Sequence, residues 1–392
     1  MAAGRGGGGT GAPPGNSGGA GGAGAAMTAS TPSAPSEAPA APGPASPLLD
    51  LPGAVPAEGL DAGTAWHYGD PVSEQRLLQQ GLALVDLSTR GVVRVGGPDR
   101  LTWLHSLTTQ SLADLEPRTS VEALLLTPKG HVEQAMHVVD DGEATWITVE
   151  PGAQGALVAF LERMRFMLRV EVEDVTDRLA VVGEPVRREG AEGEPVAWVD
   201  PWPRTAPLGV SYAAVADAEH PGAARAWREV LVPRDGLAQH VAERDLAGSW
   251  AAEALRVEAW RPRAGAETDH RTIPHELDWL RTAVHLRKGC YRGQETVARV
   301  HNLGRPPRRL VMLHLDGSGH DLPPAGSALS LPGEDGAPGR AVGAVTTSAR
   351  HHELGPVALA VVKRSTPADA VLLASVPTGG AVTAAQEVVV AP

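Results

Sequence analysis

The sequence changes character at Pro306-Pro307. Before this point, helical and alternating β patterns follow one another, while after it helical periodicity is absent. Short β-rich runs divided by Gly, Pro and Asp turns occupy the remainder, namely 310–315, 328–331, 341–346, 357–362, 370–376 and 388–390. Short strands without helices are typical of a small antiparallel barrel or sandwich. We therefore expect an α+β fold followed by a separate β-domain over 306–392.

The preceding part of the chain carries mixed patterns. Helices are expected at 72–80, just after Pro98 and at 155–164, and strands at 82–87, 92–95, 121–126, 132–139, 145–149, 168–173 and 179–182. The stretch 223–260 has a mostly helical pattern, and Pro274 is expected to open a further helix. These patterns predict two α+β domains, over 66–178 and 179–305.

Composition limits the function classes. A chain of 392 residues with 42% hydrophobic content can form two or three domains. Its net charge of −12 argues against a general binder of nucleic acid or membrane surfaces. No run of about 20 apolar residues occurs, so no membrane contact is expected. A single cysteine excludes an internal disulfide framework and favours a reducing, cytoplasmic location.

Residues 1–46 are nearly all Gly, Ala, Pro, Ser and Thr. Such a composition cannot offset the entropy of ordering, so we expect a disordered tail over 1–65, with order beginning near Trp66. The tail has one basic residue, Arg5, and no apolar core, which fits neither a secretory signal nor an Arg-rich transit peptide. Met1 and Met27 are both candidates for the true start.

The stretch Lys288-Gly-Cys-Tyr-Arg-Gly-Gln-Glu295 holds the only cysteine. Small residues beside varied polar side chains are what a functional site requires. Positive charge from Arg287, Lys288 and Arg292 would favour a thiolate at Cys290, if those side chains face the sulfur. The helix expected before Cys290 ends just ahead of it, so no helix N-terminus contributes. We predict a reactive or ligand-forming thiol.

Three other readings of Cys290 remain open. The thiol could be buried and purely structural. A nucleophile paired with a histidine is the enzyme alternative, but no protease-type motif surrounds it. Zinc ligation is a third, although the spacing to neighbouring histidines (His275, His285 and His301) matches no known pattern.

The segment 281–309 carries eight Lys or Arg against one acid, Glu295. It is either a solvated face or an anion site for a carboxylate, a phosphate or an RNA backbone. A second charged pair, Arg256 and Glu258, lies at the end of an expected helix. Residues two apart do not face each other on a helix, so we expect one of them to point inwards.

These residues together give the chain its resemblance to a known family. The motif Lys-Gly-Cys-Tyr-x-Gly-Gln-Glu resembles that of the YgfZ family, folate-binding proteins related to the glycine-cleavage T-protein (aminomethyltransferase) and to mitochondrial proteins that mature iron–sulfur enzymes. Further matching elements are Gly97–Arg100, Pro128–Gly130, Leu255–Ala259, Ile273-Pro274, Gly343–Thr346 and Leu359–Arg364. The resemblance covers roughly residues 66–390, except Glu184–Gly222.

The resemblance implies a T-protein-like ring of two α+β domains and a C-terminal antiparallel β-barrel around a tetrahydrofolate. A pocket between domains is where a ligand is expected in any case. Cys290 and Lys288 would then be catalytic. The cofactor-binding residues implied are Glu133, Arg256, Glu258, Tyr291, Arg292, Gln294 and Glu295, with no metal ligands.

One departure from the family decides between its branches. The aminomethyltransferases carry a pair of aspartates on the strand after the Gly130 turn, one of them catalytic, and this chain has Glu133-Gln134 there. A misplacement of about 1 Å can cost a hundredfold in rate. We therefore expect a tetrahydrofolate-binding accessory factor in iron–sulfur cluster assembly or repair, acting on iron–sulfur client enzymes. The alternatives are a folate-dependent one-carbon transferase using Glu133 and a tRNA-associated protein binding RNA through 281–309.

Overall fold

The computed structural model describes residues 43–318 and 321–392. Most of the tail expected over 1–65 lies outside these residues. The prediction that order begins near Trp66 is wrong, because four short elements precede or include it: η1 (Pro47–Asp50), β1 (Val55–Pro56), η2 (Gly59–Asp61) and β2 (Ala65–His67). Leu48 is buried in one core with Leu84 and Val182, so this segment contributes apolar contacts to the folded domain.

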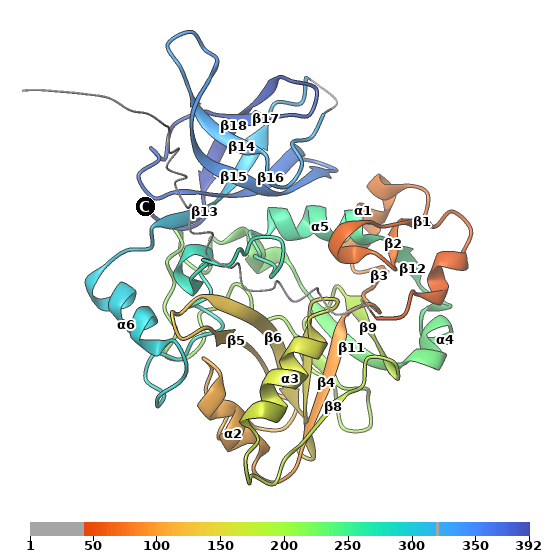
Figure 1. Cartoon of the computed structure of the whole chain (residues 1–392). Coiled ribbons are helices and arrows are strands. Elements are labelled where there is room, and N and C mark those ends of the chain that lie inside the picture. The colour runs from red at the N-terminus through yellow and green to blue at the C-terminus, as the bar shows by residue number, and fades with distance from the viewer. Residues whose placement is uncertain (1–42, 319–320) are drawn as a thin grey trace, which may run out of the picture. The chain divides into compact units, whose positions relative to one another are not determined.

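One mixed region is built on an antiparallel sheet with the order β5-β6-β7-β4-β8 (Figure 1). Its strands are β4 (Gly91–Gly96), β5 (Ser120–Leu126), β6 (Val132–Asp140), β7 (Ala144–Val149) and β8 (Glu171–Asp174). The helices α2 (Arg100–Leu107) and α3 (Gln154–Met164) share its core through Leu104 and Leu157. The predicted strands and helices of this region are confirmed, although the last strand starts only at Glu171.

A second sheet has the order β10-β11-β9-β3-β12. Its strands are β3 (Ala83–Asp86), β9 (Leu179–Glu184), β10 (Ala197–Val199), β11 (Arg228–Pro233) and β12 (Asp245–Ala247). The short helices of the same region are α1 (Pro71–Gln79), η3 (Pro221–Ala224), η4 (Arg234–Gly236), α4 (Leu237–Val241) and α5 (Ser249–Glu258). Because β3 comes from the expected domain 66–178 and the other four strands from 179–305, this sheet combines both segments. The domain boundaries at 178 and 305 stay a prediction.

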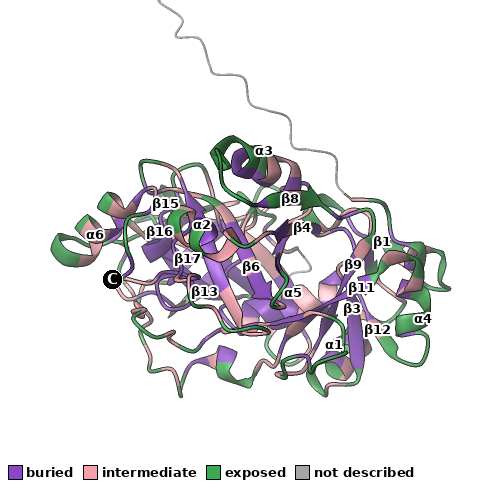
Figure 2. Ribbon diagram, turned by 90° about the horizontal axis from the view of Figure 1, so that it is seen from below, coloured by how far each residue is buried: buried purple, intermediate pink, exposed green. Residues whose placement is uncertain are grey.

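Two helical predictions are wrong. The stretch 223–260 holds β11 and β12 besides its helices, because Val230 and Val232 pair with β9 and are buried. Pro274 opens only a single 3-10 turn, η5 (Pro274–Leu277), which ends where Asp278 adopts a left-handed φ of 58°. The unforeseen helix is α6 (Gln294–Leu303), which begins inside the stretch Lys288–Glu295, called the cysteine motif below, and is exposed over much of its length (Figure 2).

The C-terminal strands close into a barrel, in the order β13-β16-β15-β14-β17-β18. They are β13 (Arg308–Leu315), β14 (Ala328–Pro332), β15 (Pro338–His351), β16 (Gly355–Lys363), β17 (Leu372–Ser375) and β18 (Ala381–Val388). The last strand precedes its predicted place, because Val389 and Val390 pack in a core shared with Trp279 and Val297 instead. The α+β class followed by an antiparallel barrel is therefore confirmed.

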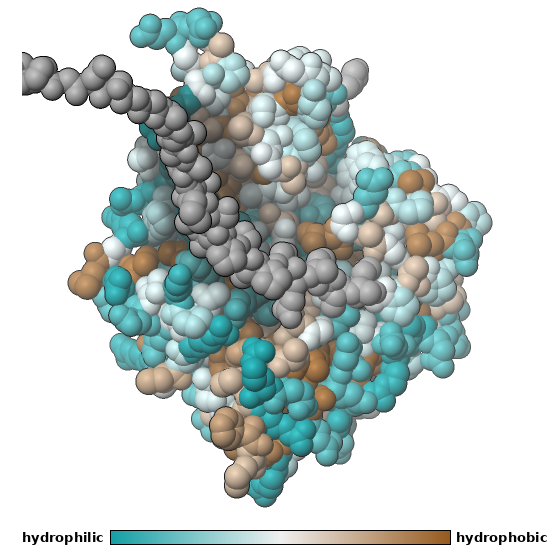
Figure 3. Space-filling model, viewed as in Figure 1, coloured by the Kyte–Doolittle hydropathy of each residue, from teal (hydrophilic) through white to brown (hydrophobic). Residues whose placement is uncertain are grey.

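The drawn face of the chain is largely hydrophilic, with hydrophobic residues in separate groups (Figure 3). Among the described residues, no helix is both long and apolar enough to pass through a membrane.

Candidate functional site

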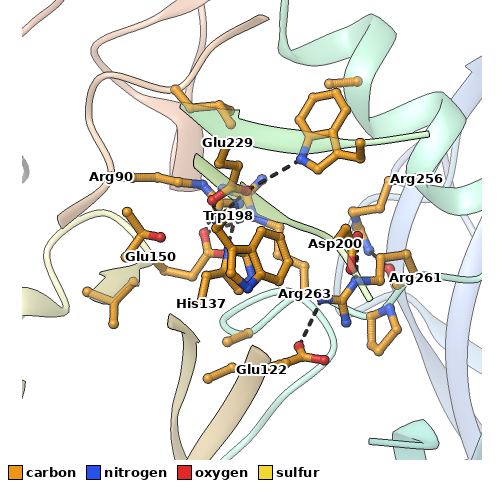
Figure 4. A pocket seen from close by; sticks show the side chains of 18 of the residues that line it. Arg90, Glu122, His137, Glu150, Trp198, Asp200, Glu229, Arg256, Arg261 and Arg263 are labelled. Carbon is orange, nitrogen blue, oxygen red and sulfur yellow. Dashed lines mark hydrogen bonds and ion pairs between the residues drawn. The ribbon is translucent and has the colours of Figure 1, made fainter. Parts of the chain in front are cut away.

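A highly charged cavity lies where strands of both sheets, α5 and the segment 261–264 meet (Figure 4). We call it the charged cavity. Among the residues that the structure describes, its lining includes five arginines and six carboxylates: Arg90, Arg225, Arg256, Arg261, Arg263, Asp61, Glu122, Glu150, Asp200, Glu229 and Glu253. Its free volume of about 60 Å³ is well below the roughly 300–1,000 Å³ of small-molecule pockets.

Arg263 contacts more carboxylates than any other arginine of the charged cavity. Its guanidinium contacts three carboxylates, Asp61 at 2.8 Å, Glu150 at 2.8 Å and Glu253 at 3.3 Å. Its backbone N–H also donates to Glu267. Burial alone would lower the pKa of Arg263, but the neighbouring carboxylates raise it well above its ordinary value. The cation therefore offsets the cost of burying several carboxylates in one place.

Of the pair Arg256 and Glu258, Arg256 points inwards and lines this cavity. The N–H groups of its guanidinium already have partners in the protein. They reach Glu253 at 2.7 and 2.9 Å, Glu267 at 2.8 Å and Thr347 at 2.9 Å. Burial alone would lower its pKa, and Glu253 and Glu267 raise it above the ordinary value. Arg256 therefore holds α5 against β15 and orients Glu253.

His137 and Trp198 form the flat wall of the charged cavity. Their rings stack in parallel, with centroids 3.7 Å apart and planes 2° apart. The Nδ1 atom of His137 lies 2.8 Å from Glu229, whose carboxylate is also 3.2 Å from Arg90. Burial alone would raise the pKa of Glu229, but Arg90 and His137 lower it far below its usual range. Glu229 is therefore an ionised acceptor beside a stacking surface.

Three buried N–H donors on this lining have no partner within the described part of the chain: Arg90 Nε, Arg261 Nη1 and Trp279 Nε1. Buried donors are almost always satisfied in folded proteins. A ligand with oxygen or nitrogen acceptors would satisfy them. The cavity thus combines an ionised acceptor, unpaired donors and a flat aromatic wall.

Glu133 and Arg292 are brought together, but outside the charged cavity. Their side chains pair at 2.8 Å and are about one third exposed, at 37% and 32%. Glu133 lies on the same face of β6 as Ala135 and His137, which do line the cavity, but nearer the start of the strand. The guanidinium of Arg292 also lies over the ring of Phe160, at 5.4 Å.

Lys288 is buried and fixes the motif to the last turn of α2 and the segment that follows it. Its ammonium donates to the carbonyl groups of His105, Thr108 and Gln110 and lies 5.2 Å from the ring centroid of Tyr291. Burial lowers the pKa of Lys288 to about 8. Because the ammonium is held by three backbone carbonyl groups, we assign Lys288 a positioning role beside the thiol.

Cys290 is exposed in an irregular segment. The predicted helix before it is absent, and α6 instead begins four residues after it.

The remaining predicted site residues are scattered over the structure. Tyr291 and Gln294 line a groove beside α6, Glu258 lines a small apolar cavity and lies 3.2 Å from His351, and Glu295 pairs with Arg299 at 87% exposure.

The basic segment 281–309 does not form one basic surface. Arg281 is fully buried against Asp278, and Arg308 pairs with Asp269 and Glu276. Asp269, Glu276 and Asp278 all precede residue 281, so the count of charges within 281–309 did not include them. Four of the eight basic residues of the segment are therefore paired with carboxylates, namely Arg281, Arg292, Arg299 and Arg308.

Sequence reasoning missed most residues of the charged cavity. A signal was present, because three pairs of polar or aromatic residues lie two apart: Trp198 with Asp200, Trp227 with Glu229, and Arg261 with Arg263. In extended backbone such pairs point to the same side. Charged and aromatic residues two apart, in or beside short strands, were therefore the informative pattern.

Comparison with known proteins supports this architecture. Residues 58–183 match the model of the GCVT N-terminal domain. A chloroplastic protein of Arabidopsis thaliana with the name "putative transferase" is 26% identical over 258 residues, covering 60% of this chain and only 56% of its own length. The crystal structure of the glycine cleavage system aminomethyltransferase T from Bartonella henselae superposes with a TM-score of 0.68 at 17% identity, covering 86% of this chain and 94% of that one. The chain has a T-protein-like fold.

Proposed function

We propose that this T-protein-like chain binds tetrahydrofolate in the charged cavity and serves as an accessory factor in iron–sulfur cluster assembly or repair. The observation that carries the folate part is the combination of ionised Glu229, the stacked wall of His137 and Trp198, and three unpartnered N–H donors. A reduced pterin is a flat ring with N–H donors on one edge and a carbonyl acceptor beside them. The carboxylate and the N–H donors of the cavity lining are the kinds of group that such an edge requires.

The donor set fits the pterin, whereas the free volume does not accommodate a whole folate. At about 60 Å³ the cavity is filled by its own side chains. Binding therefore requires the charged side chains to move apart, with Glu229 exchanging its contact to Arg90 or His137 for the ligand. Tetrahydrofolate, when bound, supplies a carrier for one-carbon groups. The protein residues supply the acceptor, the donors and the stacking surface.

The accessory role rests on Glu133 and Cys290. The acid that a transferase would use, Glu133, is paired with Arg292 and takes no part in the cavity lining. The thiol is exposed within the motif that resembles the iron–sulfur maturation branch. One thiolate cannot hold a cluster alone, so further ligands would come from a client enzyme or a small thiol.

Glu229→Gln is expected to weaken tetrahydrofolate binding about tenfold or more, because the variant loses the charged acceptor that strengthens a hydrogen bond. Isothermal titration of the full chain gives the dissociation constant directly. Glu295→Gln, at an exposed position on α6, is the matched control and should leave it unchanged. Thermal unfolding of both variants verifies that they are folded. Equal affinity in wild type and Glu229→Gln would remove the folate assignment from this cavity.

The variant Cys290→Ser tests the role of the thiol separately from the binding of tetrahydrofolate. Because Cys290 is exposed and lies outside the charged cavity, the tetrahydrofolate dissociation constant should change by less than about twofold. The same variant should fail to restore iron–sulfur enzyme activity in cells that lack the protein. Full restoration would mean that the thiol has no role in this function.

A folate-dependent aminomethyl transferase is the second candidate. It is favoured by the GCVT match over residues 58–183 and by the transferase named in Arabidopsis. Incubation with an aminomethyl donor and tetrahydrofolate tests it. Formation of methylene-tetrahydrofolate that Glu133→Ala abolishes would make the transferase the better assignment.

A further inference from the structure

We propose that a groove beside α6 binds a small carboxylate with an apolar body. This α6 groove has a free volume of about 340 Å³, within the size range of ligand pockets, which begins at roughly 300 Å³. Its lining includes Leu208, Leu286, Arg287, Tyr291, Gln294 and His301. Tyr291 and Gln294 belong to the cysteine motif, and neither lines the charged cavity.

The charge of the groove favours an anion. Among the described residues that line it, none is Asp or Glu. Arg287 is exposed and makes no ion pair or side-chain hydrogen bond within the described chain. Arg281, Arg292 and Arg308, by contrast, are each paired with carboxylates. A single unpaired guanidinium matches one carboxylate, which it can bind through two parallel hydrogen bonds.

Neutral donors accompany this cation. Burial raises the pKa of Tyr291 to about 12, so its hydroxyl stays protonated and can donate. Gln294 contributes an amide from the first turn of α6, and the Nδ1 atom of His301 is held by the hydroxyl of Tyr212 at 3.0 Å. The polar groups of the groove therefore suit an acceptor ligand.

The remaining wall is apolar and structurally fixed. Leu208 is 44% exposed with a left-handed φ of 59°, a conformation that is costly for a residue with a side chain. The N–H of Leu286 donates to the carbonyl of Leu208 at 3.0 Å, which holds this edge against the motif. Val297 closes the base of the groove from α6. An aromatic or aliphatic body would be buried on this wall while its carboxylate meets Arg287.

Phenylacetate is a suitable probe, since it joins one carboxylate to one ring. Ligand-observed NMR with the full chain should give a dissociation constant on the order of 1 mM for so small a molecule. Methyl phenylacetate, which has no charge, and inorganic phosphate, which has no apolar body, should each bind at least about tenfold more weakly. Equal binding of acid and ester, tighter binding of phosphate, or no binding of phenylacetate would overturn the proposal.

Two variants assign the binding to this groove. Arg287→Gln should weaken phenylacetate binding about tenfold, whereas Arg299→Gln, at an exposed and paired arginine of α6, should not. Tetrahydrofolate binding should be unaffected by Arg287→Gln, because the groove and the charged cavity share no lining residue. An apolar tripeptide with a free C-terminus, compared with its amide, then distinguishes a peptide carboxylate from a free small acid. Unchanged phenylacetate binding in Arg287→Gln would contradict the site.

Discussion

Arg263→Met is expected to lower the free energy of unfolding by about 3–5 kcal/mol, the cost of removing one partner from a buried ion network. Methionine keeps much of the stem volume but leaves Asp61, Glu150 and Glu253 without the guanidinium that they share. Buried carboxylates without a partner either repel one another or take up protons. Urea unfolding followed by tryptophan fluorescence gives the change in free energy.

Arg271→Met is the control for Arg263→Met. Arg271 is 67% exposed and lies 3.8 Å from Asp269, so its loss should change stability by less than about 0.5 kcal/mol. The Arg263→Met deficit should also shrink in acid, because Arg263 holds the pKa values of Glu150 and Glu253 below their usual range, and that stabilisation is lost as the two groups take up protons. A deficit as small as that of Arg271→Met would show that the carboxylates find other partners or water.

Between pH 7 and pH 4, the free energy of unfolding of His275→Phe is expected to fall by about 3 kcal/mol less than that of wild type. His275 is fully buried, has both ring nitrogens unpartnered and packs edge-on against Tyr212 at 5.5 Å. Burial lowers its pKa from the ordinary 6.5 to about 4. Phenylalanine keeps the aromatic contact and cannot take up a proton.

The sign follows from proton uptake by the unfolded chain. Above pH 6.5 His275 is neutral in both states and makes no difference. Between pH 6.5 and pH 4 only the unfolded chain binds the proton, so stability falls as pH falls. His220, whose pKa burial lowers to about 3, adds the same trend to both proteins and cancels in the comparison.

The measurement is urea unfolding of wild type and His275→Phe at pH 7, 6, 5 and 4. The two curves of stability against pH should diverge only below about pH 6.5. His270→Phe, at an exposed position, should follow wild type throughout. Parallel curves for wild type and His275→Phe would show that His275 is not held neutral in the folded state.

The elements whose patterns are local could be predicted from sequence. The strands β5, β6 and β7 lie where their apolar runs and flanking turn residues predict them, and the helices α1 and α3 follow their helical spacing. The structure of the segment after Pro274 could not be predicted from its pattern. Leu277, Leu280 and Val284 have helical spacing, but they are buried in successive turns and not in a helix. Contacts with α6 and the barrel, rather than helical pairing, hold them there.

The candidate site shows the same division. The sequence indicates Cys290 and an inward-pointing Arg256, and the structure places the first at the surface and the second in the charged cavity. It does not indicate that Glu133 pairs with Arg292, 159 positions away. That pairing depends on where α6 begins relative to β6, which no local pattern records.

By itself, the sequence determined the α+β order, the closing β-barrel and the position of a single thiol, because alternation, turn residues and composition act over a few neighbouring residues. Only the tertiary structure decided which basic side chains are paired with carboxylates and which are not. Arg263 is enclosed by Glu253, ten residues away, and by Asp61 and Glu150 from distant segments, while Arg287 contacts no acid within the described chain. Electrostatic pairing depends on distance in space, and residues far apart in the chain set that distance. The residues to test first are therefore Glu229 and Arg287, together with Cys290.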